Sequence, residues 1–133
     1  MRALYRFLPL VAVTLLVGAC ASRGRSDWEL LGQKSVSFLG VVDRDTLDVG
    51  RSQGRFRELK IVVEGAPVEM YDIDVVFGDG SSFHPETRLS FAPNTVSRTI
   101  DLPGRDRVIR KINFVYRKTS GLFRQATVSV YGR

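Results

Sequence analysis

Cysteine and histidine each occur only once in these 133 residues, as Cys20 and His84. A single cysteine excludes an internal disulfide bond and a zinc site that needs several thiolates. The sequence also lacks internal repeats, low-complexity tracts and a Pro- or Ser-rich stalk. A chain of this length is enough for one domain and can bury most of its surface without cross-links. We therefore expect one domain that depends on its hydrophobic core.

Long apolar runs are absent too, because the run Phe7–Val17 has only 11 residues. As a helix it would cover roughly 16 Å, about half of the 30 Å core of a bilayer. We do not expect a permanent transmembrane helix. Arg2 and Arg6 accompany this run, and the small residues of Val17-Gly18-Ala19-Cys20 follow it. This order of positive, apolar and small residues predicts an export signal.

The ending Val17-Gly18-Ala19-Cys20 resembles the lipobox of bacterial lipoproteins. In that family a diacylglyceryl group is attached to the cysteine sulfur, the signal is removed, and the new amino terminus is acylated. The resemblance implies a signal peptide at 1–19, a lipidated Cys20 with a short tether at 20–27, and a domain at 28–133. More than one acyl chain gives stable membrane anchoring.

The residue after the cysteine bears on the location in the envelope. Ala21 stands there, whereas Asp at this position tends to retain such lipoproteins at the inner membrane. We therefore expect a lipid-anchored protein of the outer membrane, facing the periplasm. In the alternative, Ala19-Cys20-Ala21 serves as the A-x-A site of ordinary secretory cleavage.

Charge of one sign is not massed anywhere along the chain. The formal net charge is +6, and removal of a signal that carries Arg2 and Arg6 would leave +4. The basic residues are interleaved with acids, which favours a mixed solvated surface and indicates an anionic partner only weakly. We expect no cofactor, and no nucleic-acid partner for an exported protein.

Period-two alternation of apolar and polar residues dominates from Trp28 onward and predicts β-strands. In Val68–Phe77 we expect Tyr71, Ile73, Val75 and Phe77 on one face and two aspartates on the other. The run Gly40–Asp45 is expected to separate two strands. The other expected strands are Trp28–Leu39, Thr46–Val49, Phe56–Glu64, Ser97–Leu102, Val108–Arg117 and Ala126–Tyr131.

Turn signals recur roughly every ten residues, and no segment beyond the signal shows a helical stripe. The sequence predicts an all-β fold, an antiparallel β-sandwich or jelly roll of about 7–9 strands behind an N-terminal signal peptide. A closed barrel is the alternative. The predicted core includes Leu59, Ile61, Val63, Ile73, Val75, Phe77, Ile112 and Phe114.

Several segments resemble the YaaI-like family of small bacterial envelope proteins. They are Trp28–Gly32, Asp72–Phe77, Ile100–Gly104 with Arg107–Ile109, and the closing Ala126–Gly132. The resemblance covers nearly the whole chain after the signal and implies a β-sandwich in the envelope. It implies no activity.

The most suggestive surface feature is a basic group at Arg105, Arg107, Arg110 and Lys111, with Arg117 and Lys118 further on. Arginine suits bidentate contact with phosphate or carboxylate. Anionic lipid, lipopolysaccharide or an acidic envelope protein would be suitable partners. The alternative is that Arg107 pairs with Asp106 or Asp101 and that the other cations only keep sheet edges apart.

Acid–base candidates are few. Asp72 and Asp74 share one face of a strand, and His84 follows the Gly78-Asp79-Gly80 turn. Together with Asp79 the aspartates could bind calcium, and paired carboxylates also occur in glycosidases. Exposed polar positions on an antiparallel sheet are the simpler interpretation. We expect no catalytic residues and no metal site.

These patterns favour a non-catalytic binding or structural domain on an envelope lipoprotein. Two alternatives remain open. One is an enzyme acting on envelope polysaccharide, with Asp72, Asp74 and His84 as its acids and bases. The other is a calcium-dependent sugar-binding module. An enzyme needs these side chains in one cleft.

Overall fold

The computed structural model describes residues 27–36, 40–85, 89–120 and 124–133. The expected signal at 1–19 and the expected lipidation at Cys20 lie outside these residues. Within the described residues, no helix is long and apolar enough to cross a membrane.

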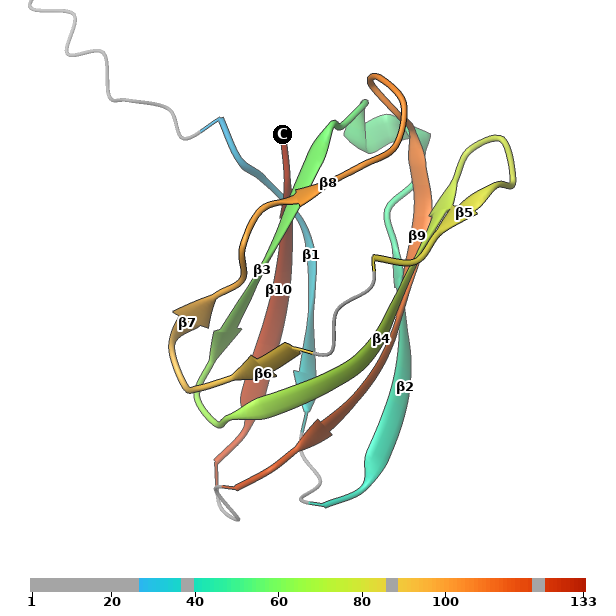
Figure 1. The fold of residues 1–133 in the computed structure, drawn as a ribbon. Helices are drawn as coiled ribbons and strands as arrows, with labels where there is room; N and C mark the ends of the chain where they lie inside the picture. Colours follow the sequence, from blue (N-terminus) through green and yellow to red (C-terminus); the bar gives the residue numbers. More distant parts are fainter. Residues whose placement is uncertain (1–26, 37–39, 86–88, 121–123) are drawn as a thin grey trace, which may run out of the picture.

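The fold is an antiparallel β-sandwich of two sheets, each with five strands (Figure 1). The first sheet has the order β1-β10-β3-β7, with β8 also on β3. Its strands are β1 (Glu29–Val36), β10 (Ala126–Gly132), β3 (Glu58–Glu64), β7 (Thr95–Val96) and β8 (Ile100–Asp101). The prediction of an all-β sandwich is confirmed.

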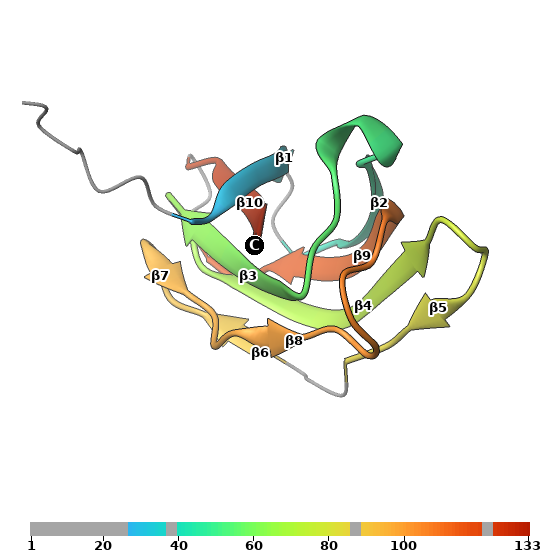
Figure 2. The same ribbon diagram turned by 90° about the horizontal axis from the view of Figure 1, so that it is seen from above.

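The second sheet has the order β2-β9-β4-β5, with β6 also on β4. Its strands are β2 (Val42–Asp48), β9 (Ile109–Lys118), β4 (Val68–Phe77), β5 (Ser82–Phe83) and β6 (Leu89–Phe91). Seen from above, the two sheets curve around a shared interior (Figure 2). Four of the ten strands have only two or three residues, so six longer strands carry the sandwich.

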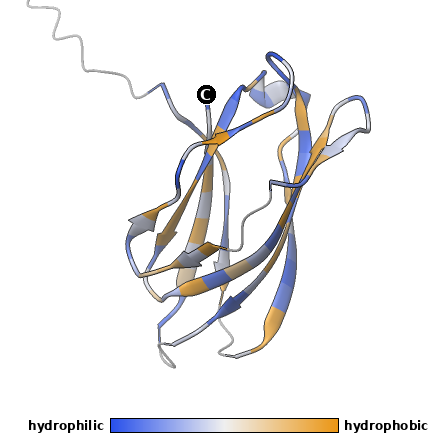
Figure 3. Ribbon diagram, in the orientation of Figure 1, coloured by the Kyte–Doolittle hydropathy of each residue, from blue (hydrophilic) through white to orange (hydrophobic). Residues whose placement is uncertain are grey.

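The core lies between the sheets and follows from the alternation along the strands. On β9, Ile112, Phe114 and Tyr116 are buried and face the interior, while the residues between them are only partly buried. In Figure 3, which is coloured by hydropathy, the same alternation is seen as hydrophobic and hydrophilic bands along the strands. All eight predicted core residues are buried. One of the connecting turns depends on glycine, because Gly65 has φ +86° and a Cβ there would lie 2.2 Å from the Gln125 carbonyl oxygen.

Three sequence predictions are wrong in detail. Of the expected strand Ser97–Leu102 only Ile100–Asp101 forms a strand, β8, and the preceding β7 ends at Val96. Tyr71 does not share the inner face with Ile73, because the β4–β9 register shifts between Met70 and Asp72. This β-bulge turns Tyr71 outward and leaves Met70 buried, as an extra residue in one strand does.

The third error concerns Gly40–Asp45, which the sequence analysis placed between two strands. Strand β2 already begins at Val42 and pairs with β9 through Asp48. Its inward positions include Asp45, which is opposite Phe114 and accepts a hydrogen bond from the buried Tyr116 hydroxyl. Burial and this hydrogen bond raise the pKa of Tyr116. Apolar alternation is missing because β2 is an edge strand with inward acids.

Candidate functional site

One end of the sandwich, here called the arginine-rich end, is formed by loops from both sheets. Backbone hydrogen bonds join these loops. Phe56 and Arg107 exchange two N–H···O bonds of 2.9 Å, and the amides of Val49 and Gly50 both donate to the Arg110 carbonyl. These hydrogen bonds bring Arg51, in the 3-10 helix η1 (Arg51–Gln53), to the same end as arginines from three other segments. Those arginines are Arg55, Arg57, Arg105, Arg107, Arg110 and Arg133.

The Arg107 side chain contacts three hydrogen-bond acceptors and one aromatic ring. Its guanidinium donates to the Pro103 carbonyl at 3.0 Å, to the Asp79 carboxylate at 3.2 Å and to the Ser81 hydroxyl at 2.9 Å. Its Cζ also lies 3.9 Å from the centre of the Phe77 ring. Only 25% of the side chain is exposed. Arg107 therefore ties the β8–β9 loop to the β4–β5 hairpin.

Two further arginines at this end are also neutralised by acids. Arg57 pairs with Asp106, and Arg133 pairs with Glu58. The hydrogen bond from each arginine, followed by its positive charge, lowers the pKa of its carboxylate partner. Asp79 behaves similarly, because hydrogen bonds from the Ser81 hydroxyl and amide, and then the charge of Arg107, lower its pKa.

The remaining four arginines differ in having no ion pair within the described residues. They are Arg51, Arg55, Arg105 and Arg110, and all four are exposed. Arg55 donates a hydrogen bond of 3.4 Å to the backbone carbonyl of Asp106, and the charges of Arg55 and Arg105 add to that of Arg57 in lowering the pKa of Asp106. The arginine-rich end thus contains three arginines that are held in ion pairs, here called clamped, and four that form no ion pair within the described residues.

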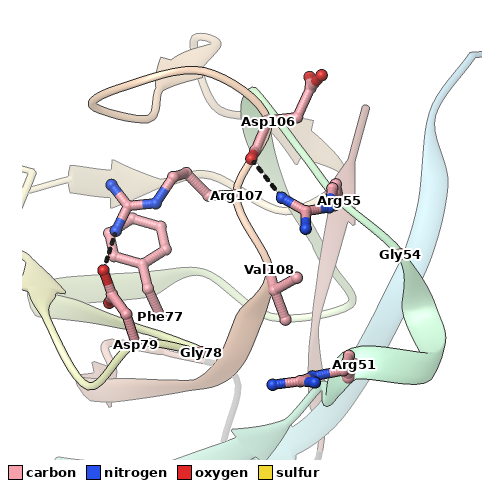
Figure 4. A pocket seen from close by; sticks show the side chains of 9 residues that line it. All are labelled: Arg51, Gly54, Arg55, Phe77, Gly78, Asp79, Asp106, Arg107 and Val108. Atoms are coloured by element: carbon pink, nitrogen blue, oxygen red, sulfur yellow. Dashed lines mark hydrogen bonds and ion pairs between the residues drawn. The ribbon is translucent and has the colours of Figure 1, made fainter.

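Three pockets open among these residues. The first, of about 500 Å³, lies between η1, the β4–β5 hairpin and the β8–β9 loop, and its lining includes Arg51, Arg55 and Arg107. Figure 4 shows the Arg51 and Arg55 side chains reaching toward the region of Val108, while Arg107 lies over Phe77. A second pocket, of about 240 Å³, shares Arg51 and adds Arg110.

The third pocket, of about 600 Å³, is lined by Arg57, Glu58, Asp101 and Arg105, among others. It lies at the same end, next to the first residues of β3 and to β8. Its lining contains two acids as well as two arginines, whereas the lining of the smallest pocket contains two arginines and no acid.

The structure places the four predicted binding residues differently. Arg105 and Arg110 line pockets at the arginine-rich end. Arg107 lines the first pocket, but it forms an ion pair with Asp79. The sequence analysis had considered Asp106 or Asp101 as its partner. Lys111 lies on the outward side of β9, where it is opposite Asp48 of β2.

Sequence reasoning missed Arg51 and Arg55. Both lie far along the chain from Arg105–Lys111, and only the antiparallel contact of Phe56 with Arg107 brings them there. A signal was present in the sequence, because Gly50 and Gly54 bracket Arg51-Ser52-Gln53 and are followed directly by Arg55. Glycines at both sides of a short polar segment indicate a turn, and this turn displays arginines.

The acid–base candidates do converge, on the outer face of the second sheet. His84 Nδ1 lies 3.7 Å from an Asp72 oxygen, and His84 Nε2 lies 3.3 Å from Asp74 Oδ1. The other Asp74 oxygen accepts a hydrogen bond from Asn113, which accepts one from Thr46. The side chains of His84 and Asp72 are 57% and 52% exposed. This row of polar groups crosses four neighbouring strands or their ends.

Asp79 takes no part in that row, because it binds Arg107 and Ser81. Asp79 is therefore not grouped with Asp72 and Asp74, as a calcium site of these three residues would require. Among the residues that the structure describes, no three His, Cys, Asp or Glu side chains are grouped so that they could hold a metal ion.

The described chain enters the sandwich at the arginine-rich end (Figure 1). Glu29 at the start of β1 pairs with Gly132 at the end of β10. The ring of Trp28 lies between two cations, with Lys60 Nζ at 4.6 Å and Arg133 Cζ at 4.8 Å from its centre. Such cation–π contacts fix the entry point of the chain.

The family described as a domain of unknown function, DUF2541, matches residues 9–132. No curated protein and no solved structure matches the chain.

Proposed function

The chain belongs to the DUF2541 family, and we propose that its β-sandwich is a non-catalytic binding domain of the bacterial envelope. In this proposal a lipid on Cys20 anchors the chain, in the outer membrane and facing the periplasm. The arginine-rich end then contacts the anionic groups of that membrane.

The observation that carries this proposal is the position of the chain entry. Trp28 is fixed at the arginine-rich end by Lys60 and Arg133. Seven residues, 21–27, separate the proposed anchor from it, and fully extended they reach at most about 25 Å. A lipid on Cys20 would therefore keep this end of the sandwich, rather than the opposite one, next to the membrane.

The charge at this end supports an anionic partner. Arg51, Arg55, Arg105 and Arg110 form no ion pair within the described residues. Each basic residue near an anionic surface contributes about 1 kcal/mol of attraction. A lipid anchor raises the local concentration of such groups, so weak contacts add to the anchoring.

Binding is favoured over catalysis by the surroundings of the acid–base cluster. His84 and Asp72 are more than half exposed on the outer face of the sheet, and the three pockets at the arginine-rich end are lined by other residues. An enzyme needs its acid and base groups to converge in one cleft, and none of these pockets contains the acid–base cluster. The enzyme alternative is tested by incubating the protein with envelope polysaccharide. Hydrolysis by the wild type that is lost in H84A would support this alternative.

The test of the proposal uses residues 27–133, which contain all ten strands and the whole core. Circular dichroism first verifies that this segment has a β-spectrum. Its binding is then measured on vesicles of phosphatidylcholine alone and of phosphatidylcholine with phosphatidylglycerol. We expect binding to the anionic vesicles only, and weaker binding as salt increases, because salt screens exposed charges over about 8 Å.

A matched pair of variants locates the binding surface. Replacing Arg51, Arg55, Arg105 and Arg110 with serine should weaken binding by about two to three orders of magnitude. Replacing Arg44, Arg98 and Arg124, three exposed arginines outside the arginine-rich end, should have a much smaller effect. Equal binding to both kinds of vesicle, or equal losses in the two variants, would disprove the proposed surface.

The anchor has its own test. Mass spectrometry of the protein from cells should find residues 1–19 removed and acyl groups on Cys20, and C20S should leave unprocessed precursor or a released product. An unmodified Cys20 thiol in the wild-type protein would rule the anchor out. Fractionation with inner-membrane markers would contradict the outer-membrane location.

A further inference from the structure

We propose that the pocket between η1 and the β8–β9 loop binds a phosphate dianion, either inorganic phosphate or a phosphate monoester, through Arg51 and Arg55. This inference rests on the proposed function and adds to it the chemical class of the ligand. The relevant pocket has a volume of about 500 Å³ (Figure 4).

The walls of this pocket combine cations from two segments with an apolar surface. Arg51 comes from η1 and Arg55 from the strand entry that follows it, and Phe77 and Val108 contribute carbon surface. The neighbouring pocket shares Arg51 and adds Arg110. A charge–charge contact against an apolar wall is stronger than one in open water, because the local dielectric constant is lower.

No acid in the lining forms an ion pair with Arg51 or Arg55 within the described residues, although the charge of Arg55 helps to lower the pKa of Asp106. The Asp79 carboxylate is occupied by Arg107 and Ser81, and the Asp106 carboxylate is occupied by Arg57. Arg55 contacts only the backbone carbonyl of Asp106, through one of its five N–H groups. No ion pair occupies the other donors of Arg55 or those of Arg51 within the described residues.

Two arginine forks from different segments select for a tetrahedral dianion. Each guanidinium binds two oxygens of a planar or tetrahedral anion. One fork already occupies both oxygens of a carboxylate, and a phosphodiester offers one negative charge and two unesterified oxygens. A phosphate monoester offers three oxygens and up to two charges, so both arginines can bind it. Inorganic phosphate is a tetrahedral dianion of the same kind, so the ligand can be inorganic phosphate or a lipid headgroup such as phosphatidic acid.

The experiment uses the full chain in micelles of a neutral detergent. Inorganic phosphate is added, and the side-chain Nε–H resonances of the arginines are followed by NMR. We expect saturable shifts of Arg51 and Arg55. R51S/R55S should bind at least tenfold more weakly, while R124S should bind like the wild type. R51K/R55K keeps both charges without the forks, and it should bind several-fold more weakly.

Two lipid arms identify the source of the phosphate. Micelles doped with phosphatidic acid, a monoester, are compared with micelles doped with phosphatidylglycerol, a diester. Shifts with phosphatidic acid alone indicate a headgroup site, and shifts with inorganic phosphate alone indicate a soluble ligand. Either result supports a site for a phosphate dianion.

Different results would contradict the phosphate site and the proposed membrane surface. Equal shifts with both lipids and none with inorganic phosphate would overturn the phosphate-dianion site, yet leave the anionic surface intact. Lysine variants that bind as well as the wild type would overturn the bidentate contacts. If the vesicle experiment detects no anionic binding but inorganic phosphate still saturates Arg51 and Arg55, the proposed membrane surface fails and the pocket remains.

Discussion

The interior of the sandwich and its arginine-rich end are built on different principles. Between the sheets, apolar residues from six long strands are buried at alternate positions, and Phe114 and Ile73 are opposite each other on β9 and β4. At the arginine-rich end, loops from both sheets place seven arginines close together. Only three of these arginines have ion pairs within the described residues.

This difference separates residues that stabilise the fold from residues that are available for binding. Burial of apolar surface is the dominant favourable term in folding, and the interior supplies it. Exposed charges contribute little to stability. The four arginines that have no ion pair should therefore be replaceable without loss of the fold, and the clamped Arg107 should lie between the two extremes.

The largest expected effect is in the interior. Phe114 is only 2% exposed, so F114A should cost about 3–5 kcal/mol of the free energy of unfolding through lost burial and a cavity. Urea denaturation measures this loss. V115A, on the outward side of the same strand, is the control and should cost much less. Equal losses in the two variants would show that the two faces of β9 are not distinguished as described.

How far the sequence predicted this interior follows from its periodicity. Strands β3, β4, β9 and β10 are visible because each alternates over at least seven residues. The errors have local causes. The bulge after Met70 changes the phase of β4, and Asp43 and Asp45 at inward positions of β2 hide that edge strand. Neither feature changes composition, so neither can be found from hydrophobic patterns.

The arginine-rich end was predicted only in part. Arg105, Arg107 and Arg110 are neighbours in the chain, and their local density made them visible. Arg51 and Arg55 are brought to them by the pairing of Phe56 with Arg107, which depends on the tertiary fold. Sequence spacing likewise could not show that Asp79, on the β4–β5 hairpin, would neutralise Arg107.

A smaller effect is expected for the clamped arginine. R107A removes three hydrogen bonds and the contact with Phe77, and it should cost about 1–3 kcal/mol. R51A removes no ion pair within the described residues and should change stability by less than about 0.5 kcal/mol. Thermal or urea unfolding compares the two variants. If R51A proves as destabilising as R107A, the distinction between clamped and available arginines is wrong.

The smallest expected effect is a change in the pH dependence of stability at the arginine-rich end. Asp79 has a pKa below its ordinary value of 3.8, first because of the Ser81 hydroxyl and amide and then because of Arg107. The folded state therefore favours the carboxylate, and this contribution is present above about pH 4 and is lost as the pH falls through the folded pKa. Glu58 and Asp106 have the same sign, so they steepen the same acid decline.

D79N removes one of these carboxylates and should make stability fall less steeply below pH 4. Urea denaturation at a series of pH values from 6 downward, in steps of about half a unit, measures the slope. D48N is the matched control, since Asp48 is exposed and has no ion pair within the described residues. It should leave the slope nearly as in the wild type. An unchanged slope in D79N would mean that Arg107 is held by its contacts with Pro103, Ser81 and Phe77 and that its charge pairing with Asp79 adds nothing measurable to the fold.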